Sequence, residues 1–531
     1  MKLILREIAN NKYGTILAQD ISTLFEDEKL HGAGVYSDRC YIRLNKDFGQ
    51  DDYKSLINSI IEQLEAKDKK ALREYLQIYC TVQNISDRDN YMQILNDQLD
   101  VMELQAKYYH RNIYALASGY DNLKKLKRDT EKIILPTNVD DELINKWYKL
   151  GFDKKDRDDL IFYKNIKNGV YSFPSLLEIT TKGLERFKPN IYRDKIHPLF
   201  EKSLGEEIDG KKDKTAEDNE ILKEIKKSFP DNFQTAHKYA VIVTADGDNV
   251  GKLISHVSEK NDDDLLQSLA TNIADFAKEA SKLIYIYGGK PVYIGGDDLV
   301  FFAPVVSHSG EHKESWFQGD GHIFQLISVL DKTFNDIWKQ WLTDNKITDI
   351  HPSLSYGMSI TYYKFPLNEA MKLSGDLLFE VAKKYPTEAN PSKNCIAVQL
   401  MTHSGSYDKV VFEKQDPTDS TFYHLQNLLE NFGDKESTIS SVLQRLRGDT
   451  ELILSIANDG DTFDAYFTNE YNLHDIKDRK KEAFIRHSIS LFNKIFAQQK
   501  DKPKEALNQL CSMYRLLNFL IHKETGNGSE I

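Results

Sequence analysis

The chain has few cysteines and no long apolar run, and both absences narrow the kind of protein it can be. Its 531 residues include only four cysteines, Cys40, Cys80, Cys395 and Cys511, and none forms a CxxC pair. A zinc ribbon or a redox dithiol is therefore not indicated. No stretch comes near the roughly 20 apolar residues that a membrane span needs, and the N-terminal apolar run is too short for a signal peptide. We expect a cytoplasmic protein with no membrane partner.

An excess of basic residues is also lacking, since the formal net charge is −12. A free-standing nucleic-acid binder usually carries more Lys and Arg than Asp and Glu. Any contact with RNA is therefore expected to be local or made through partner subunits. The hydrophobic content of 40% is enough for packed cores, and at about 150 residues per domain the length indicates several domains.

The N-terminal region, residues 1–130, alternates short apolar runs with a helical pattern. Gly34–Leu44 and Tyr75–Val82 are rich in Tyr, Ile and Val and are predicted to be strands. Ser55–Leu64 lies between them and carries apolar residues on one helical face. These features predict a small α/β unit.

The flanking regions are predicted to be helical. Residues 131–235 are mainly helical, with a charged linker at 204–220 that has almost no large apolar residue. Residues 413–531 show helical apolar stripes and are predicted to form an α-helical bundle.

Residues 236–412 carry the clearest pattern. The continuous apolar run Tyr239–Thr244 is typical of a buried central strand. A helix spanning Leu266 to Leu283 follows and is predicted to end at Gly288 and Gly289. The remaining predicted elements are strands Lys290–Ile294, Leu299–Ala303, Leu354–Thr361 and Cys395–Leu400, and helices Phe324–Trp341 and Leu367–Lys384. This order predicts a ferredoxin-like palm, so the fold class is α+β.

Three carboxylates stand at the ends of these strands. Asp246 follows the first strand, and Asp297 and Asp298 lie in a tight hairpin. A strand–helix–strand connection places the first strand beside the hairpin, so the three side chains are expected to converge at one edge of the sheet. Clustered carboxylates repel one another unless a cation compensates them. Oxygen ligands of this kind suit two Mg²⁺ or Mn²⁺ ions.

The residues around the carboxylates fit a phosphate ligand. Gly295 and Gly296 permit unusual backbone dihedrals and close approach of a triphosphate. Gly247 and Asn249 are expected to do the same beside Asp246, where backbone amides could cradle phosphate. Each motif alone is often only a turn. Their joint occurrence at two strand ends, around one helix, favours a metal site.

The same residues resemble a known family. YAVIVTADGDNVGKLI followed by KPVYIGGDDLVFFAPV is similar to the palm of the polymerase/cyclase large subunit of type III CRISPR–Cas effector complexes, Cmr branch. The segments PSLSYGMSI, FPLNEAM, VAKK and KNCIAVQLMTHSG follow in the order found in this palm and in GGDEF cyclases. Upstream, FPSLLEITT resembles a segment that precedes the palm in Cmr-type subunits.

The resemblance implies a specific activity. In that family the GGDD palm uses two metal ions to join ATP molecules into a signalling nucleotide once target RNA is bound, and some members join AMP to S-adenosylmethionine instead. By matching position, Asp246 and Asp298 would be the principal metal ligands, with Asp297 beside them. The residues implied to lie near the nucleotide are Asp248, Asn249, and Lys383 or Lys384. The implied partners are other subunits of a Cmr-like complex, CRISPR guide RNA and target RNA.

Two departures from the family are visible. Many of its members carry an N-terminal HD nuclease, but the first 130 residues hold only His31 and His110, with no adjacent His-Asp pair. The pair His474-Asp475 lies in the helical C-terminal region, where a surface role is expected. Cysteine ligands for the zinc that many relatives carry are also missing. No nuclease activity is expected, and the N-terminal unit could stand for the family's first, non-catalytic palm.

Two alternatives stay open. A freestanding GGDEF-type diguanylate cyclase would have Glu-Phe where this chain has Asp298-Leu299. A non-catalytic scaffold subunit would have no need for clustered carboxylates, so the acidic set favours an enzyme.

Overall fold

The computed structural model describes most of the chain. The two longest stretches outside the description are residues 18–38 and 105–174. The described residues are 2–17, 39–45, 47–63, 78–84, 91–104, 175–200, 214–260, 262–308, 321–387, 390–391, 393–402, 407–430, 435–457, 459–471, 473 and 477–521. His31, His110 and the pair His474-Asp475 lie outside these ranges.

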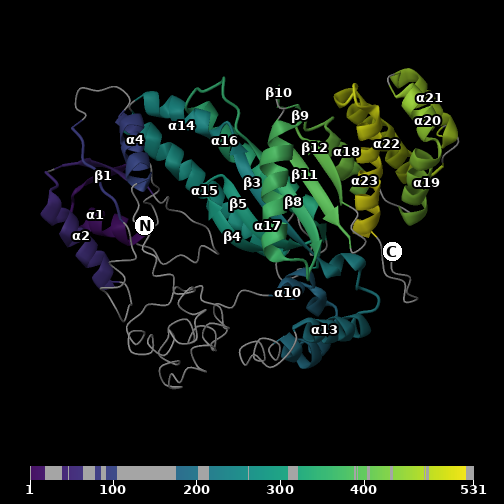
Figure 1. The fold of residues 1–531 in the computed structure, drawn as a ribbon, viewed down its shortest axis with the longest axis horizontal. Helices are drawn as coiled ribbons and strands as arrows, with labels where there is room; N and C mark the ends of the chain where they lie inside the picture. Colours follow the sequence, from purple (N-terminus) through teal and green to yellow (C-terminus); the bar gives the residue numbers. More distant parts are fainter. Residues whose placement is uncertain are drawn as a thin grey trace.

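A six-stranded sheet of order β12-β11-β8-β3-β5-β4 forms the centre of the molecule (Figure 1). Its strands are β3 (Tyr239–Asp248), β4 (Lys290–Gly295), β5 (Asp298–Pro304), β8 (Ser353–Tyr362), β11 (Cys395–Met401) and β12 (Tyr407–Glu413). The four strands β8-β3-β5-β4 are antiparallel neighbours in the ferredoxin-like order. Strand β11 is parallel to β8, and β12 adds an antiparallel edge that the sequence pattern did not predict. The predicted α+β palm is confirmed.

Helices cover both faces of this sheet, because β3 directs apolar side chains alternately to one face and to the other. Val241 and Val243 belong to the core shared with α15 (Asp263–Tyr287) and α16 (Ile323–Asp344). Ile242 points to the other face and packs with residues of α10 (Leu176–Thr180) and α17 (Leu367–Asp376). A strand with apolar residues on both sides is the pattern of a fully buried central strand.

The long helix α15 begins and ends as its sequence predicts. The Asp262 side chain accepts a hydrogen bond from the amide of Leu265, which caps the N-terminus, and Gly288 ends the helix with φ 96°. An additional helix, α14 (Val250–Glu259), precedes it in a segment for which the sequence pattern predicted no element. Its buried side chains Val250, Leu253 and Val257 recur at helical spacing, which gives this short segment an apolar face.

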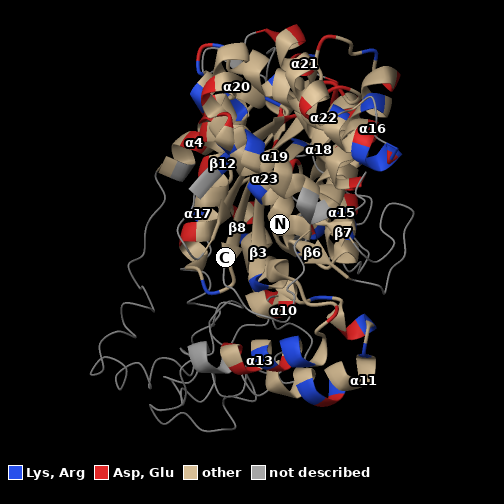
Figure 2. Ribbon diagram, turned by 90° about the vertical axis from the view of Figure 1, so that its right-hand side faces the viewer, with Lys and Arg blue, Asp and Glu red and all other residues tan. Residues whose placement is uncertain are grey.

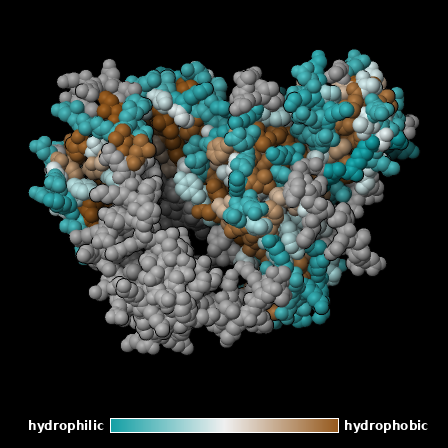
Figure 3. Space-filling model, viewed as in Figure 1, coloured by the Kyte–Doolittle hydropathy of each residue, from teal (hydrophilic) through white to brown (hydrophobic). Residues whose placement is uncertain are grey.

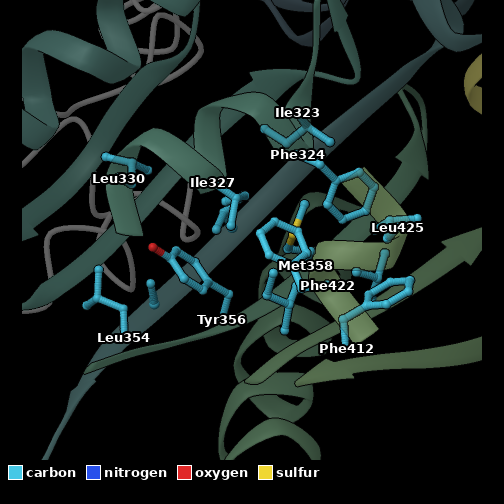
Figure 4. Close-up of a cluster of buried hydrophobic side chains, with 14 of the residues drawn as sticks. Ile323, Phe324, Ile327, Leu330, Leu354, Tyr356, Met358, Phe412, Phe422 and Leu425 are labelled. Carbon is cyan, nitrogen blue, oxygen red and sulfur yellow. The ribbon is translucent and has the colours of Figure 1, made fainter. Parts of the chain in front are cut away.

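The C-terminal helices form the predicted helical region, and their core is continuous with the palm. They are α18 (Thr421–Glu430), α19 (Lys435–Gly448), α20 (Thr450–Ile456), α21 (Gly460–Glu470), α22 (Arg479–Gln498) and α23 (Pro503–Ile521). Figure 4 shows the junction, where Phe324 of α16, Met358 of β8, Phe412 of β12 and Phe422 of α18 meet.

The N-terminal elements agree with the sequence only in part. They are α1 (Lys2–Asn10), β1 (Gly14–Leu17), β2 (Tyr41–Leu44), α2 (Gln50–Gln63) and α4 (Tyr91–Leu104). Helix α2 confirms the predicted helix, and β2 confirms the end of the predicted strand Gly34–Leu44. The strand predicted at Tyr75–Val82 is wrong over its described residues, since 78–84 contain no strand. Tyr79 and Val82 are exposed there, so the β-forming side chains find no sheet surface to pack on.

The charged linker predicted at 204–220 also needs correction. Residues from Lys214 onward are helical and form the start of α13 (Lys214–Ser228), while 204–213 lie outside the described residues. Ile221, Ile225 and Phe229 pack into a local core and anchor this helix. The Ala, Glu and Lys residues before them have high helix propensity, so the helix extends back into the charged segment. Lys residues and the acidic Asp and Glu residues intermix along α13 (Figure 2).

The remaining short elements connect these layers. They are η1 (Leu184–Arg186), α11 (Pro189–Ile191), η2 (Tyr192–Ile196), η3 (Thr235–Lys238), β6 (Val306–Ser307), β7 (Gly321–His322), η4 (Leu377–Val381), η5 (Ala382–Lys384), β9 (Pro386–Thr387) and β10 (Asn390–Pro391). Over the described part of the chain, every helix is too short or too polar to cross a membrane.

Candidate active site

The first feature of the site is the position of Asp246 beside the hairpin. Ala245 pairs with Leu299 across β3 and β5, and Gly295 pairs with Asp298 across β4 and β5. Ala245 and Leu299 are buried on the α15 and α16 side. Since successive side chains alternate, Asp246 and Asp298 project from neighbouring strands toward the opposite face, where α17 lies. The predicted convergence of these carboxylates is found.

Two glycines, one in the hairpin turn and one at the end of β3, allow the two acidic motifs to lie close together. Gly296 has φ +72°, a conformation that glycine adopts without steric cost. Gly247, at the end of β3, has no room for a side chain, because a Cβ there would overlap the carboxylate of Asp297 and the side chain of Val250. The chain therefore brings Asp297 against the backbone that carries Asp246.

The carboxylates of the site influence one another's protonation. Burial, followed by the nearby charge of Asp298, raises the pKa of Asp297 to about 7. Loss of contact with water, followed by the charge of Asp246, raises the pKa of Asp298 to about 6. Asp298 is exposed, so its carboxylate is only partly shielded from water. Two neighbouring carboxylates that resist being ionised at the same time stabilise a cation bound beside them.

Lys383 supplies positive charge at the same place. Its ammonium group donates a hydrogen bond to Asp246 Oδ2 and lies 3.7 Å from Asp248 Oδ1. Lys384 points elsewhere, because it is paired with Glu380 at 2.6 Å. Of the two lysines considered from the sequence as a phosphate contact, only Lys383 is brought to the carboxylates.

The neighbouring residues of the DGDN motif are held by protein groups. Asp248 is buried, and its Oδ2 accepts hydrogen bonds from Ser355 at 2.6 Å and from the Asn394 amide at 2.8 Å. Asn249 has φ 63° and donates from Nδ2 to the His351 carbonyl at 3.1 Å. Both side chains fix the end of β3 to β8 and to the start of β11.

The helix that carries Lys383 differs from the prediction and depends on a glycine that the sequence analysis did not select. One helix was predicted over Leu367–Lys384, but α17 ends at Asp376 and continues as the π-helical turn η4 and the 3-10 turn η5. A Cβ at Gly357 of β8 would overlap Ser374 O and Leu378 N, so this glycine allows the helix backbone to lie directly on the sheet. An isolated glycine within a strand is the sequence signal for such an approach.

Side-chain hydrogen bonds hold the same helix on β3 and β8. The hydroxyls of Thr244 and Ser374 are 2.8 Å apart, and Ser359 donates to the Ala370 carbonyl at 2.8 Å. The position of Lys383 over Asp246 is therefore fixed by tertiary contacts and not by helix geometry alone.

The described residues contain no group of three or more His, Cys, Asp or Glu side chains placed to hold a metal ion. In this arrangement the ammonium of Lys383 lies at the Asp246 carboxylate. The donor set itself fits Mg²⁺ or Mn²⁺, since Asp246 and Asp298 offer hard carboxylate oxygens from neighbouring strands. The metal site remains a prediction.

A ferredoxin-like sheet with carboxylates at the ends of its central strands defines a palm domain of the nucleotidyltransferase-like class. Residues 238–397 match the family model for the Cas10/Cmr2 second palm domain. The chain is 24% identical over 390 residues to the CRISPR system Cmr subunit Cmr2 of Pyrococcus furiosus, covering 65% of this chain and 41% of that protein. The resemblance to the large subunit of type III CRISPR systems, Cmr branch, is confirmed.

The crystal structure of a Csm1–Csm4 cassette in complex with cA4 is similar with a TM-score of 0.30 and 13% sequence identity. The similarity covers 54% of this chain and 37% of that chain.

Proposed function

We propose that this chain is a two-metal nucleotidyltransferase of a type III CRISPR effector complex, activated by target RNA, which makes a signalling nucleotide from ATP in antiviral defence. The product is a cyclic oligoadenylate or AMP joined to S-adenosylmethionine. The observation that carries the proposal is the placement of Asp246 and Asp298 on neighbouring strands of a Cas10/Cmr2-type palm, with Lys383 beside them.

Each side chain of the site has a role in this proposal. Asp246 and Asp298, with Asp297 beside them, would hold Mg²⁺ or Mn²⁺ through their carboxylate oxygens. Two such ions, when bound, activate an attacking hydroxyl and stabilise a leaving pyrophosphate. Lys383 would turn from Asp246 to the phosphate oxygens of ATP, since an ammonium pairs well with either anion. Gly296 keeps the turn free of a side chain next to the phosphates.

The proposed partners are the other subunits of a Cmr-like complex, the CRISPR guide RNA and the target RNA. The net charge of −12 supports RNA contacts that are made mainly through the complex. The chain spans 41% of the length of the Cmr2 relative it matches, so the relative's assembly is carried over here as part of the proposal.

The test is synthesis by the purified effector complex that contains the full chain. The complex is incubated with ATP and Mg²⁺ or Mn²⁺, with and without target RNA and S-adenosylmethionine, and products are identified by mass spectrometry. We expect an adenylate product that depends on target RNA. A product made from GTP alone without RNA would favour a freestanding cyclase.

The matched variant separates catalysis from scaffolding. Asp297→Ala combined with Asp298→Ala should abolish synthesis while the complex still assembles and binds target RNA. A wild-type complex that binds RNA but makes no nucleotide under any of these conditions would refute the enzyme and leave the scaffold role.

A further inference from the structure

We propose that Phe379 is the stacking surface for the base of the nucleotide whose phosphates are contacted by Lys383. This inference rests on the proposed function, because it places the nucleotide at the carboxylates of the palm. It adds a residue that the GGDD and DGDN motifs do not contain.

The first observation is the exposure of a large aromatic side chain next to the charged site. Phe379 keeps 49% of its surface exposed, although its neighbours Leu377 and Leu378 are buried. Figure 3, which shares the view of Figure 1, shows hydrophobic and hydrophilic residues intermixed over the region of α17 and the neighbouring strands. An exposed aromatic ring beside a charged site is a candidate for ligand contact, since burial in the core would otherwise be favoured.

The second observation is the contact between Phe379 and Lys383. The Lys383 ammonium lies 5.7 Å from the centre of the Phe379 ring and also donates to Asp246. The Lys383 side chain therefore connects the Phe379 ring to Asp246, one of the predicted metal ligands. A nucleotide site needs charged groups for the phosphates and, next to them, a flat apolar surface for the base.

The third observation is that an unusual backbone presents these two side chains. Phe379 belongs to the π-helical turn η4, and Lys383 follows in η5. Turns of this kind occur often at functional sites. The turn lies on β8 because Gly357 leaves room for Leu378 N, so the presentation of Phe379 is built into the palm.

A nucleotide base is favoured over a protein side chain as the occupant. Every base has a π face, and stacking on an aromatic side chain adds affinity with little dependence on base identity. The ring is flanked by charged residues, since Asp376 at the end of α17 and Glu380 of η4 are both exposed and Glu380 pairs with Lys384. An isolated ring of this kind offers one flat contact and not an extended protein interface.

The test measures binding of ATP, GTP and inorganic triphosphate with Mg²⁺ to the full chain by calorimetry. Phe379→Ala should weaken ATP and GTP by the same factor, about 5- to 150-fold, the range for loss of one base–aromatic stack. Inorganic triphosphate, which has no base, should bind unchanged. Phe379→Trp should restore nucleotide affinity, and Phe379→Leu should not. Leu367→Ala, an exposed apolar residue that begins α17, is the matched control and should change nothing.

The outcomes separate this inference from the proposed function. If wild-type protein makes the signalling nucleotide but Phe379→Ala binds ATP normally, the stacking role is wrong and the enzyme stands. Equal weakening of ATP and inorganic triphosphate would mean that Phe379 only positions Lys383, which overturns the inference. A wild-type chain that binds neither ligand rules out a nucleotide at this site altogether.

Discussion

The backbone of Gly247 lies directly against the carboxylate of Asp297, so that the two acidic motifs of the palm are packed on each other. The strand end and the hairpin turn therefore hold each other in position. A side chain at Gly247 must displace Asp297 or Val250, and the geometry of the carboxylates changes with it.

Gly247→Ala tests this contact. We expect a loss of about 1–3 kcal/mol in the free energy of unfolding, the usual cost of forcing an extra methyl group into a packed place, together with loss of metal-dependent nucleotide synthesis. Gly251→Ala is the control, because no atom lies within 4 Å of a Cβ at that position in α14. The control should be neutral or slightly stabilising. Equal effects of the two substitutions in urea unfolding would contradict the packing argument.

Gly357→Ala should act at a distance from the carboxylates. A Cβ there would push η4 off the sheet, since Ser374 O and Leu378 N occupy the space. We expect lower stability and a displaced Lys383, observed as weaker binding of inorganic triphosphate. Gly375→Ala, at the end of α17 with no atom within 4 Å of a Cβ, should leave triphosphate binding unchanged. Normal triphosphate affinity in Gly357→Ala would show that the helix position does not control the lysine.

The two adjacent lysines should differ sharply. Lys383→Met removes the ammonium that contacts Asp246 and should lower nucleotide synthesis about 100-fold or more, as removal of one charged contact in an active site does. Lys384→Met removes the exposed ion pair with Glu380, which contributes about 0.3–0.5 kcal/mol to stability. Steady-state rates and thermal unfolding measured on both variants check this. Comparable rates would mean that Lys383 has no role in the reaction.

A pair of histidines in the C-terminal helices predicts a pH-dependent stability. The Nδ1 atoms of His424 and His487 are 3.0 Å apart, and His424 Nε2 lies 3.0 Å from Asp419 Oδ1. Burial lowers the pKa of His424 despite the nearby charge of Asp419, and burial also lowers the pKa of His487. Both rings are therefore neutral in the folded chain at a pH where the unfolded chain already binds protons.

The sign of the effect follows from this difference. Stability is fully present above about pH 6.5, the pKa of an unfolded histidine, and is lost as the pH falls through the lower folded values. Urea unfolding at pH 7.5 and 5.5 should show a larger loss for the wild-type chain than for the variant with His424→Gln and His487→Gln. An equal loss in both proteins would show that other groups set the acid sensitivity.

Local sequence patterns were sufficient for the palm and for the position of its carboxylates. The apolar run before Asp246, the amphipathic helix that ends at Gly288 and the glycine turn before Asp298 are all local features, and each produced the predicted element. The strand predicted at Tyr75–Val82 failed over its described residues because β-forming side chains need a neighbouring strand, which the local pattern does not reveal.

Tertiary structure decided which neighbours of the carboxylates can act with them. The sequence could not choose between Lys383 and Lys384, because the choice depends on a π-helical turn that rests on Gly357 from another strand. The resemblance implies that Asp248 lies near the nucleotide, which stays a prediction, and the fold shows that Ser355 and the Asn394 amide hold that carboxylate. The sequence by itself therefore determined the acidic ends of the strands, since they follow from local patterns. The register between strands and the packing of a helix on the sheet determined what surrounds those carboxylates, because such contacts join residues far apart in the chain.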